Sequence, residues 1–367
     1  MRVAVIGAGA VGASAVYYLS KAKDVELTVF DEGLGQATKA AAGIISPWFS
    51  KRRNKAWYRL ARLGADFYPQ LLSDLEADGI SSNFYQRTGV FVLKKDEEKL
   101  EELYQLALTR RKESPLIGEL VILGAKEAKV RFPDLEGFSK LLYATGGARV
   151  DGHLLTETLL KAAGAQVVAK KVTLTPVDDG YLVDGQHFDK VILATGAWLA
   201  ECLEPLGYTV DIRPQKGQLR DYYFEDRDIQ DCPVVMPEGE IDIIPFDKHR
   251  LTLGASHEND KGFDISFDRA VLDDMESKAQ PYFSKWKQAK ETRERVGIRA
   301  YTSDFSPFFG EVPHLAHVYA ASGLGSTGLT IGPLLGQQLA QLVLGEPLLL
   351  EKRDYPIEKY IRLQDEG

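Results

Sequence analysis

Three glycines close to the amino terminus have the spacing of a phosphate-binding turn. Gly7, Gly9 and Gly12 follow an apolar run at residues 2–6 and precede an alanine-rich run of helical length. In a G-x-G-x-x-G turn, the first glycine permits a tight bend and the second lets the backbone approach a pyrophosphate, while the third lets helix and strand pack closely. The helix N-terminus behind the turn offers N–H groups and partial positive charge to phosphates. The pattern therefore predicts a dinucleotide site.

An acidic residue follows at the distance that such a site requires. A second apolar run, Val25 to Phe30, ends at Asp31. A carboxylate about 20 residues beyond the glycines grips ribose hydroxyls in βαβ units of this kind. The alternative interpretation is a glycine-rich turn in some other α/β protein. A signal peptide fits poorly, because the basic region is weak and cleavage would destroy the whole unit.

Composition narrows the class of protein. A chain of 367 residues exceeds what one core usually serves, so we expect two domains or one large discontinuous pair. The net charge of −8 argues against a nucleic-acid partner, because phosphate contacts need clustered lysine and arginine. The basic cluster Lys51-Arg52-Arg53 is interpreted as a solvated loop. Cys202, Cys232 and the scattered histidines give no metal-ligand spacing, so no metal is predicted. A reducing cytoplasm fits best, no membrane-spanning helix is expected, and peripheral membrane association stays open.

Apolar periodicity predicts the elements that position the turn. The expected helices span residues 55–78, 95–111, 125–131, 153–163, 267–290 and 333–344. The expected strands span residues 89–93, 119–123, 141–143, 148–150, 166–168, 171–174, 180–183, 186–188, 190–194, 218–224, 242–245, 250–255 and 316–321. Two later strands also run into small-residue or glycine-rich turns, which suits a dinucleotide domain.

The order of these elements predicts an α/β fold with a discontinuous Rossmann-like domain. Residues 1–46, 147–211 and 291–367 have its character. Residues 47–146 and 212–290 are predicted to form an inserted α+β domain. A large cofactor at the seam of two such domains is a usual place for an active site.

Further motifs occur in a fixed order along the chain. They are Thr38-Lys39-Ala40-Ala41-Ala42-Gly43, Val191 to Trp198, Pro214-Gln215-Lys216-Gly217-Gln218, Ile243 to Gly254, Gly297 to Thr302 and Gly323 to Pro333. With the amino-terminal turn they resemble the D-amino-acid oxidase family of FAD enzymes, nearest to glycine oxidase, D-amino-acid dehydrogenase and monomeric sarcosine oxidase. The likeness covers nearly the whole chain. The first turn and the Val191 strand occur in many flavoproteins, but the ordered set is specific.

The resemblance implies an FAD-binding domain and a substrate domain whose mixed sheet covers the flavin. The residues that it assigns to FAD are Gly7, Gly9, Gly12, Asp31, Thr38, Ala42, Gly43, Val172, Thr195, Gly196, Gly325, Ser326, Thr327, Gly328 and Leu329. The cysteine that holds flavin covalently in sarcosine oxidase falls on Arg299 here, so we expect the FAD to be non-covalent.

The resemblance also assigns a substrate role to Arg299. It matches the arginine that grips a substrate carboxylate in glycine-oxidase-like members, and a planar fork suits that task. From the residues alone, a surface arginine paired with Glu294 or Glu311 is the preferred interpretation, and the resemblance reverses that preference. Asp242 and Ser326 are further candidate catalytic residues.

Both further candidates depart from the family pattern. Relatives often carry tyrosine at the position of Asp242 and arginine at that of Phe246, and glycine oxidase has a second arginine where Ser326 stands. A carboxylate at Asp242 could pair with a substrate ammonium. A solvated turn residue is the slightly preferred interpretation, because Gly239 to Asp242 is acidic and turn-like.

The leading hypothesis is an FAD enzyme that oxidises a small amino acid or secondary amine to an imine. The electron acceptor would be O2, a quinone or a carrier protein, and a homo-oligomer stays open. An FAD-dependent dehydrogenase of the 2-hydroxy-acid or glycerol-3-phosphate type is an alternative, with His257 as its base. The other interpretation of His257, a solvent-facing loop residue, is preferred. The alternative that is not an enzyme is a non-catalytic FAD-binding subunit of a larger complex.

Overall fold

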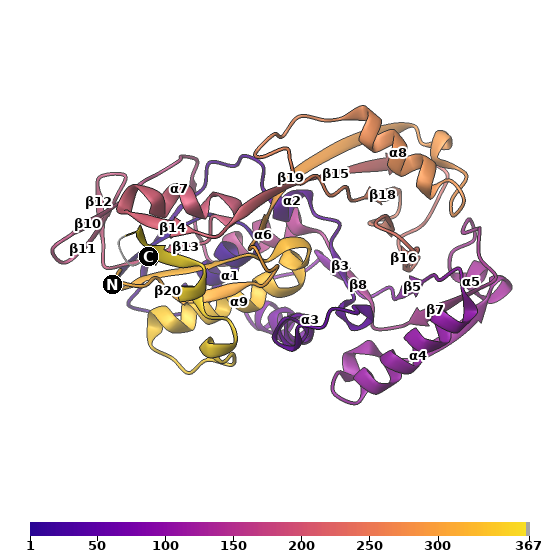
Figure 1. Ribbon diagram of the computed structural model, residues 1–367, viewed down its shortest axis with the longest axis horizontal. Coiled ribbons are helices and arrows are strands. Elements are labelled where there is room, and N and C mark those ends of the chain that lie inside the picture. The colour runs from indigo at the N-terminus through magenta and orange to yellow at the C-terminus, as the bar shows by residue number, and fades with distance from the viewer. Residues whose placement is uncertain (365–367) are drawn as a thin grey trace.

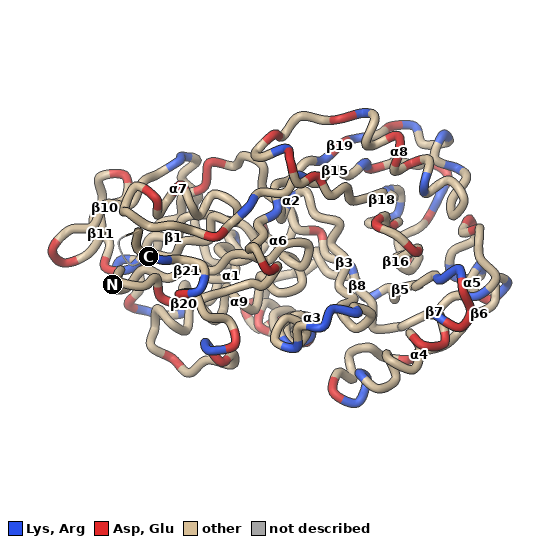
Figure 2. The backbone as a smooth tube through the Cα atoms, viewed as in Figure 1, with Lys and Arg blue, Asp and Glu red and all other residues tan. Residues whose placement is uncertain are grey.

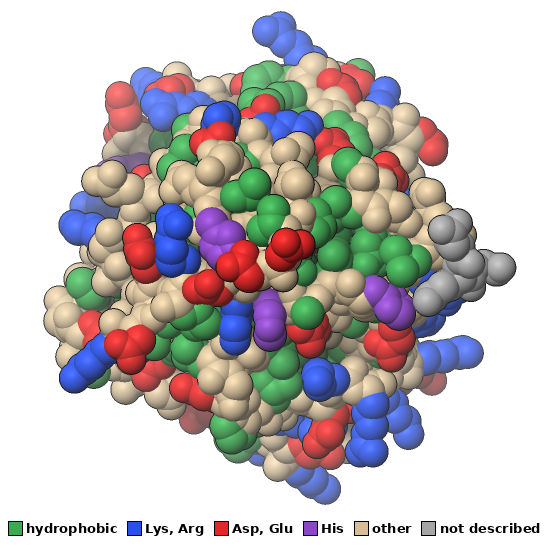
Figure 3. Space-filling model, turned by 90° about the vertical axis from the view of Figure 1, so that its left-hand side faces the viewer, with side chains coloured by type: hydrophobic (Ala, Val, Ile, Leu, Met, Phe, Trp, Pro, Cys, Tyr) green, Lys and Arg blue, Asp and Glu red, His purple; other side chains and the backbone are tan. Residues whose placement is uncertain are grey.

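The computed structural model describes residues 1–364, whose longest sheets meet at a seam. In Figure 1 the sheet that contains β1 lies at the left with both chain ends, and the larger sheet extends to the right. β15 (Arg213–Tyr223) and β19 (Glu291–Tyr301) run along the top of the view between the two parts. The face seen in Figure 3 carries charges of both signs mixed with apolar side chains. Within the described residues, no helix is long and apolar enough to cross a membrane.

The first sheet is built around β1 (Arg2–Ile6), the strand that precedes the predicted turn. β1 pairs in parallel with β13 (Lys190–Leu193) on one side and β2 (Glu26–Phe30) on the other. The order of the six strands is β20-β21-β13-β1-β2-β9, and β20 alone is antiparallel to its neighbour. The outer strands are β9 (Val167–Val168), β20 (Phe308–Glu311) and β21 (Val318–Ser322). A mostly parallel sheet with a buried central strand confirms the predicted α/β class.

Helices α1 (Ala10–Leu19) and α9 (Gly328–Leu344) pack against each other beside this sheet, and α3 (Lys55–Ala77) packs on α9. Small residues let the first pair approach closely. A Cβ on Gly336 would come within 2.3 Å of the carbonyl oxygen of Val11. The remaining helices are α2 (Ala37–Ala40), α4 (Glu97–Arg111), α5 (Ala125–Arg131), α6 (Gly152–Ala162), α7 (Leu199–Leu203) and α8 (Arg269–Ala279).

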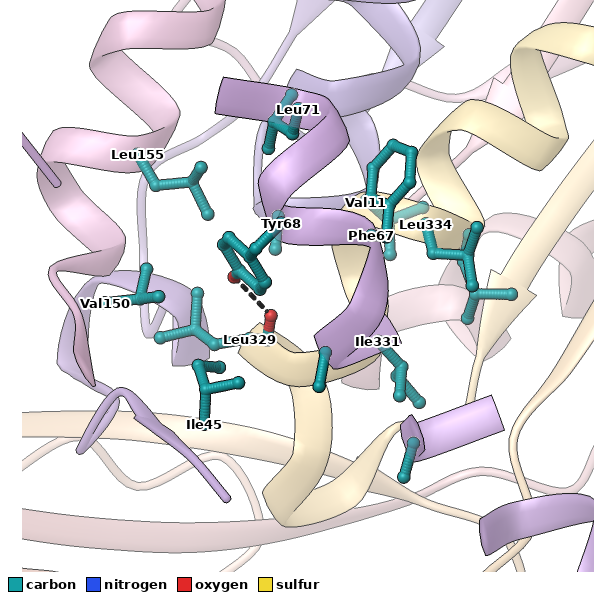
Figure 4. Packing of buried hydrophobic residues seen from close by; sticks show 14 of the residues in the cluster. Val11, Ile45, Phe67, Tyr68, Leu71, Val150, Leu155, Leu329, Ile331 and Leu334 are labelled. Carbon is teal, nitrogen blue, oxygen red and sulfur yellow. Dashed lines mark hydrogen bonds between the residues drawn. The ribbon is translucent and has the colours of Figure 1, made fainter. Parts of the chain in front are cut away.

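A tyrosine of α3 completes the first turn of α9. Pro333 has no N–H, so the carbonyl of Leu329, four residues before it, lacks its helical donor. The hydroxyl of Tyr68 donates to that oxygen at 2.6 Å inside a cluster of buried apolar side chains (Figure 4). Gly64 allows this approach, because a Cβ there would come within 2.3 Å of the carbonyl oxygen of Thr330. A residue of α3, Tyr68, therefore helps to hold the start of α9 in place.

The second sheet has eight strands in the order β19-β15-β18-β17-β16-β5-β7-β6. Its other members are β5 (Val90–Val92), β6 (Leu120–Gly124), β7 (Lys140–Ala144), β16 (Val234–Met236), β17 (Asp242–Pro245) and β18 (Arg250–Gly254). β5 and β16 are parallel while the other pairs are antiparallel, so the sheet is mixed, as predicted. One smaller sheet contains β3 (Ile44–Ile45), β8 (Ala148–Val150) and β4 (Tyr85–Gln86). Another contains β10 (Leu174–Val177), β11 (Gly180–Val183) and β12 (Gln186–Phe188). A further sheet pairs β14 (Tyr208–Val210) with β22 (Ile361–Leu363).

Two predicted elements have different bounds in the structure. The helix predicted over 267–290 ends at Ala279, because Pro281 follows and cannot donate within a helix. The strand predicted over 171–174 is wrong in its position. β10 starts at Leu174, where pairing with Val183 of β11 begins.

The predicted boundary at residue 291 does not coincide with the sheets. β19 was assigned to the dinucleotide domain, yet it pairs with β15 along its whole length at the edge of the eight-stranded sheet. Only the segment after Tyr301 returns to the six-stranded sheet, through β20 and β21. The remaining domain bounds stay a prediction.

Candidate functional site

Two cavities meet at the seam between the large sheets. The first has a volume of about 210 Å3 and lies over the glycine-rich turn. The second, of about 580 Å3, lies between the start of α9 and the eight-stranded sheet. Ala37, Thr38, Arg299, Gly325 and Gly328 line both cavities, so the two adjoin. A long, two-part ligand would fit such a site.

The glycine-rich turn has the geometry that its sequence predicts. Gly7 has φ +98°, and a Cβ there would come within 2.3 Å of the carbonyl oxygen of Ala194. A Cβ on Gly12 would come within 1.8 Å of the carbonyl oxygen of Gly7, so this glycine packs beneath the turn and lines neither cavity. Gly9 does line the first cavity, and Thr38 Oγ1 alone lies within 4 Å of its added Cβ. Of the three glycines, Gly9 is thus the one whose backbone is open toward a ligand, and this is the position that a pyrophosphate must approach.

Asp31 joins the end of β2 to the turn. Its Oδ2 accepts a hydrogen bond from the Ala8 N–H at 2.6 Å. Its Oδ1 accepts from the Gly33 N–H at 2.6 Å and from Gln36 Nε2 at 2.8 Å. The carboxylate lines the first cavity and also fixes the loop around it. Gln36 contributes to the site without any signal in the sequence.

The other residues assigned to a cofactor are distributed over the two cavities. Those on the first cavity are Gly7, Gly9, Asp31, Thr38, Val172, Thr195, Gly196, Gly325 and Gly328. Those on the second are Thr38, Ala42, Gly43, Gly325, Ser326, Thr327, Gly328 and Leu329. The predicted set, except Gly12, therefore lines the two adjoining cavities.

Arg295 connects the segment around Ala41, which lines the second cavity, to the eight-stranded sheet. This residue of β19 donates from Nη1 to the carbonyl of Ala41 at 3.1 Å, and its Nε lies 2.9 Å from Asp221 Oδ2. Asp221 is nearly inaccessible to solvent, which strengthens the ion pair relative to a surface one. The pair joins the two halves of the site. Sequence reasoning missed both residues.

Arg299 lies half-buried where the two cavities meet. Its Nη1 donates to Gln215 Oε1 at 3.0 Å and to the Ser256 carbonyl at 2.8 Å, and burial lowers its pKa from the usual range. Among residues 1–364 no carboxylate lies within ion-pair distance of it. Glu294 instead pairs with Arg220 at 3.5 Å. The surface ion pair considered from the sequence is therefore absent, and the guanidinium stays available to an anionic ligand.

Asp242 and His257 both line the second cavity. Asp242 is half-buried at the start of β17, and burial raises the pKa of its carboxyl to about 7. The solvated-turn interpretation of Asp242 is wrong, because β18 pairs beside it through Gly254. His257 is partly exposed. Burial and the nearby Arg299 lower the pKa of its imidazole from the usual range.

The beginning of α9 closes the second cavity from the opposite side. Ser326 is exposed there, and Thr327, Gly328 and Leu329 follow it into the helix. The N–H groups of a first helical turn favour negative charge on a ligand. Ser326 lies in the predicted place and supplies a hydroxyl, but no hydrogen bond within residues 1–364 orients its side chain.

Lys94 also lines the second cavity and was missed. It follows β5 and looks like the solvated end of a strand in the sequence. Of the basic cluster at residues 51–53, Lys51 stands at the same cavity, and Arg52 and Arg53 line a separate one of about 360 Å3. All three are exposed, in agreement with a solvated segment. No group of His, Cys, Asp or Glu in the described chain could hold a metal ion.

Comparison with known proteins identifies the family. The model of the DAO family, described as FAD dependent oxidoreductase, matches residues 2–342. The chain belongs to this family.

Several members are similar over nearly their whole length. The uncharacterized oxidoreductase YurR of Bacillus subtilis (strain 168) is 40% identical over 361 residues, 96% of this chain and 97% of that protein. The structure of iminodiacetate oxidase from Chelativorans sp. BNC1 matches with a TM-score of 0.90 and 34% identity, covering 97% of this chain and 99% of that one. Glycine oxidase of Pseudomonas aeruginosa is 28% identical over 96% of this chain and 98% of its own.

The protein is thus an FAD-dependent oxidoreductase, and the DAO family confirms the predicted cofactor. The residues present fit FAD in three ways. An open glycine backbone faces the first cavity, an acid stands at the end of β2, and a helix N-terminus faces the second cavity. The D-amino-acid oxidase family named from the sequence is confirmed.

Proposed function

We propose that this oxidoreductase acts on the C–N bond of a small amino acid or secondary amine. Arg299 carries the proposal, since it is a half-buried cation with no acidic partner among the described residues, at the point where the cofactor cavity meets the substrate cavity. Bidentate binding by its guanidinium would orient a substrate carboxylate and so position the adjacent carbon.

In this reaction the carbon beside nitrogen loses a hydride, the nitrogen loses a proton, and an imine forms. FAD supplies the two-electron acceptor when bound. Arg299 holds the carboxylate, and Asp242, on another strand of the same sheet, is the group for the amine. An ionised carboxylate can accept the proton that an ammonium must lose before oxidation, and a pKa near 7 suits that exchange. Water then hydrolyses the imine to a carbonyl compound and an amine.

Two similar proteins have names that support this substrate class. One is called iminodiacetate oxidase and the other glycine oxidase, and both names denote small amino acids. The electron acceptor would be O2, a quinone or a carrier protein, which hydrogen peroxide assays and quinone assays distinguish.

The deciding experiment is anaerobic reduction of the bound flavin, followed by its absorbance. The panel is glycine, sarcosine, D-alanine, D-proline, iminodiacetate, D-lactate and glycerol-3-phosphate. We expect at least one amine to bleach the flavin within seconds and the hydroxy compounds to be inert. Bleaching by none of the amines would disprove the proposal.

A hydroxy-acid substrate is the second candidate, because His257 lines the second cavity and burial lowers the pKa of its imidazole. A neutral imidazole can take the proton of an alcohol. Rapid bleaching by a hydroxy compound, lost in His257→Gln, would favour this candidate over amine oxidation.

A further inference from the structure

The cavity of about 360 Å3 at the start of α3 is strongly basic. Among the described residues that line it, one is acidic, Glu113, and six are cationic: Arg52, Arg53, Lys55, Arg59, Arg62 and Arg110. Figure 2 shows the run of lysine and arginine that leads into α3. None of these six cations lines either cavity at the seam, so the function proposed above makes no use of them.

The carboxylates around this basic cavity neutralise only part of its charge. Arg59 lies 3.3 Å from Asp354, and Arg62 lies 3.2 Å from Asp66. The other four cations have no carboxylate within ion-pair distance among residues 1–364. With Glu113 included, three carboxylates against six cations leave an excess of three positive charges. Such an excess attracts anions, and multivalent anions most strongly.

Arg110 is the half-buried cation of this cavity, and its guanidinium is held in place from two directions. Nη1 donates to the Ser50 carbonyl at 2.7 Å, and Cζ lies 4.1 Å from the centre of the Tyr58 ring. No residue in the range 1–364 accepts a hydrogen bond from Nε or Nη2. Burial lowers the pKa of the guanidinium, so an anion beside it would favour its charged form. Nε and Nη2 are therefore free to bind an oxyanion through two parallel hydrogen bonds.

The hydroxyl of Tyr58 is a second donor without an acceptor. Its oxygen is buried, yet it forms no hydrogen bond within the described part of the chain. Burial raises the pKa of this hydroxyl, so it remains protonated near pH 7. Tyr58 lines the basic cavity together with Arg110. Because buried polar groups normally have a partner, an unused donor at this place indicates an acceptor that the protein itself does not supply.

We propose that the basic cavity is a binding site for a phosphate monoester, with Arg110 as the bidentate partner of the phosphoryl group and Arg53 and Lys55 as the charges that attract it. A phosphate monoester has a charge of about −1.5 to −2 near pH 7 and three strong acceptor oxygens. That charge suits the excess of positive charge better than the single charge of a carboxylate does. A soluble phosphorylated compound and a lipid head group both offer this chemistry.

The test is isothermal titration of the FAD-saturated enzyme with phenyl phosphate, so that the glycine-rich turn is already occupied. We expect binding of one molecule per chain, about tenfold tighter than that of phenyl sulfate, which has one negative charge fewer. Arg110→Lys should weaken phenyl phosphate about tenfold, because lysine keeps the charge and loses the fork. Arg111→Lys is the matched control, since Arg111 is the exposed neighbour and lines none of the three cavities.

A second variant keeps the test decisive if Arg110→Lys loses its fold. Arg53 and Lys55 are exposed, and their side chains have no hydrogen bond or ion pair within residues 1–364, so folding should not depend on them. Arg53→Gln with Lys55→Gln should weaken phenyl phosphate about tenfold or more. Lys126→Gln with Lys287→Gln removes the same charge from exposed positions outside the cavity and should preserve the affinity.

Cosedimentation with phosphatidylcholine vesicles, with and without phosphatidic acid, identifies the source of the phosphoryl group. Capture by phosphatidic acid that Arg110→Lys weakens would assign it to a lipid head group, and binding of phenyl phosphate without capture would assign it to a soluble compound. The inference is wrong if neither probe binds, if phenyl sulfate binds equally well, or if Arg110→Lys behaves like Arg111→Lys. Loss of phenyl phosphate binding in Arg299→Ala would also overturn it, because the ligand would then occupy the second cavity. Flavin reduction is not measured, so the proposed function is tested separately.

Discussion

The hydroxyl of Tyr68 occupies the hydrogen-bonding position that Pro333 leaves empty at the carbonyl of Leu329. The donor for this helix carbonyl is a side chain of another helix, and the carbonyl lies in the turn that closes the second cavity. The stability of that turn therefore depends on α3 as well as on α9.

Tyr68→Phe should destabilise the protein by about 1–3 kcal/mol, because a buried carbonyl loses its donor. The loss should be smaller in a Pro333→Ala background, where the restored N–H can donate to Leu329. Urea unfolding of the two single variants and the double variant measures this coupling. Strictly additive effects would show that Tyr68 does not replace the proline's missing bond.

Gly217 lies beneath the guanidinium of Arg299, and a Cβ there would come within 2.7 Å of Cζ. We expect Gly217→Ala to displace the guanidinium and raise KM about tenfold while FAD content stays unchanged. In an Arg299→Ala background the same change should have little further effect. A full additional loss in that background would mean that Gly217 acts by another route.

Arg299→Lys should raise KM steeply, and Arg299→Ala should nearly abolish turnover. Lysine keeps the charge but loses the planar fork, so it attracts the carboxylate without orienting it. Steady-state kinetics with the best substrate of the amine panel give KM and kcat separately. Wild-type values in both variants would remove Arg299 from the site.

Asp31→Asn should weaken FAD binding by about tenfold or more, with activity per bound flavin largely retained. The amide replaces a charged acceptor of three hydrogen bonds, each worth about 1.5–3 kcal/mol. Titration of the apoprotein with FAD measures the affinity. Glu32→Gln is the control, since Glu32 lines the same cavity without a hydrogen bond to any described residue. Equal affinities in both variants would exclude the assigned role.

Asp242 should make the stability of the folded protein depend on pH. Its folded pKa of about 7 is above the ordinary value of about 4, so the folded state binds the proton more tightly than the unfolded state does. The free energy of unfolding should therefore fall, relative to Asp242→Asn, by a few kcal/mol at most between about pH 4 and pH 7. A constant difference between the two proteins over that range would contradict the burial of this carboxyl.

The same ionisation should appear in catalysis. Above about pH 7 the carboxylate attracts the substrate amine, so kcat/KM should rise through that pH in the wild type and lose this inflection in Asp242→Asn. His257→Gln is the control, because the imidazole has a lowered pKa and faces the same cavity. An inflection that survives in Asp242→Asn and disappears in His257→Gln would assign it to the histidine.

The cofactor half of the site could be predicted from the sequence because its determinants are local. Gly7, Gly9 and Asp31 lie within one βαβ unit, where apolar periodicity shows the strand, the helix and the second strand directly. Thr195 and Gly325 follow strands that are also evident in the sequence. Such signals depend on spacing along the chain, which the sequence contains in full.

The substrate half depends on pairing between distant segments, which the sequence does not display. Lys94 follows a short strand in a run of charges, and only the pairing of that strand with residues 234–236 places Lys94 at a cavity. Asp242 looks solvated until β18 and β16 enclose it. The domain boundary predicted at residue 291 differs from the sheets for the same reason. β19 joins the eight-stranded sheet only by pairing with β15.

The order of strands in the first sheet has a consequence for synthesis of the chain. β1 emerges first from the ribosome, yet one of its neighbours, β13, begins at residue 190, and the next strand, β21, begins at residue 318. Until α9 has been made, the glycine-rich turn can have β2 and β13 beside β1 but no α9 behind it. We therefore expect the complete flavin site to form only after nearly the whole polypeptide has been made, because residues 325–329 line its cavities. A chain stalled on the ribosome before residue 318 is expected to bind FAD less tightly than the full chain.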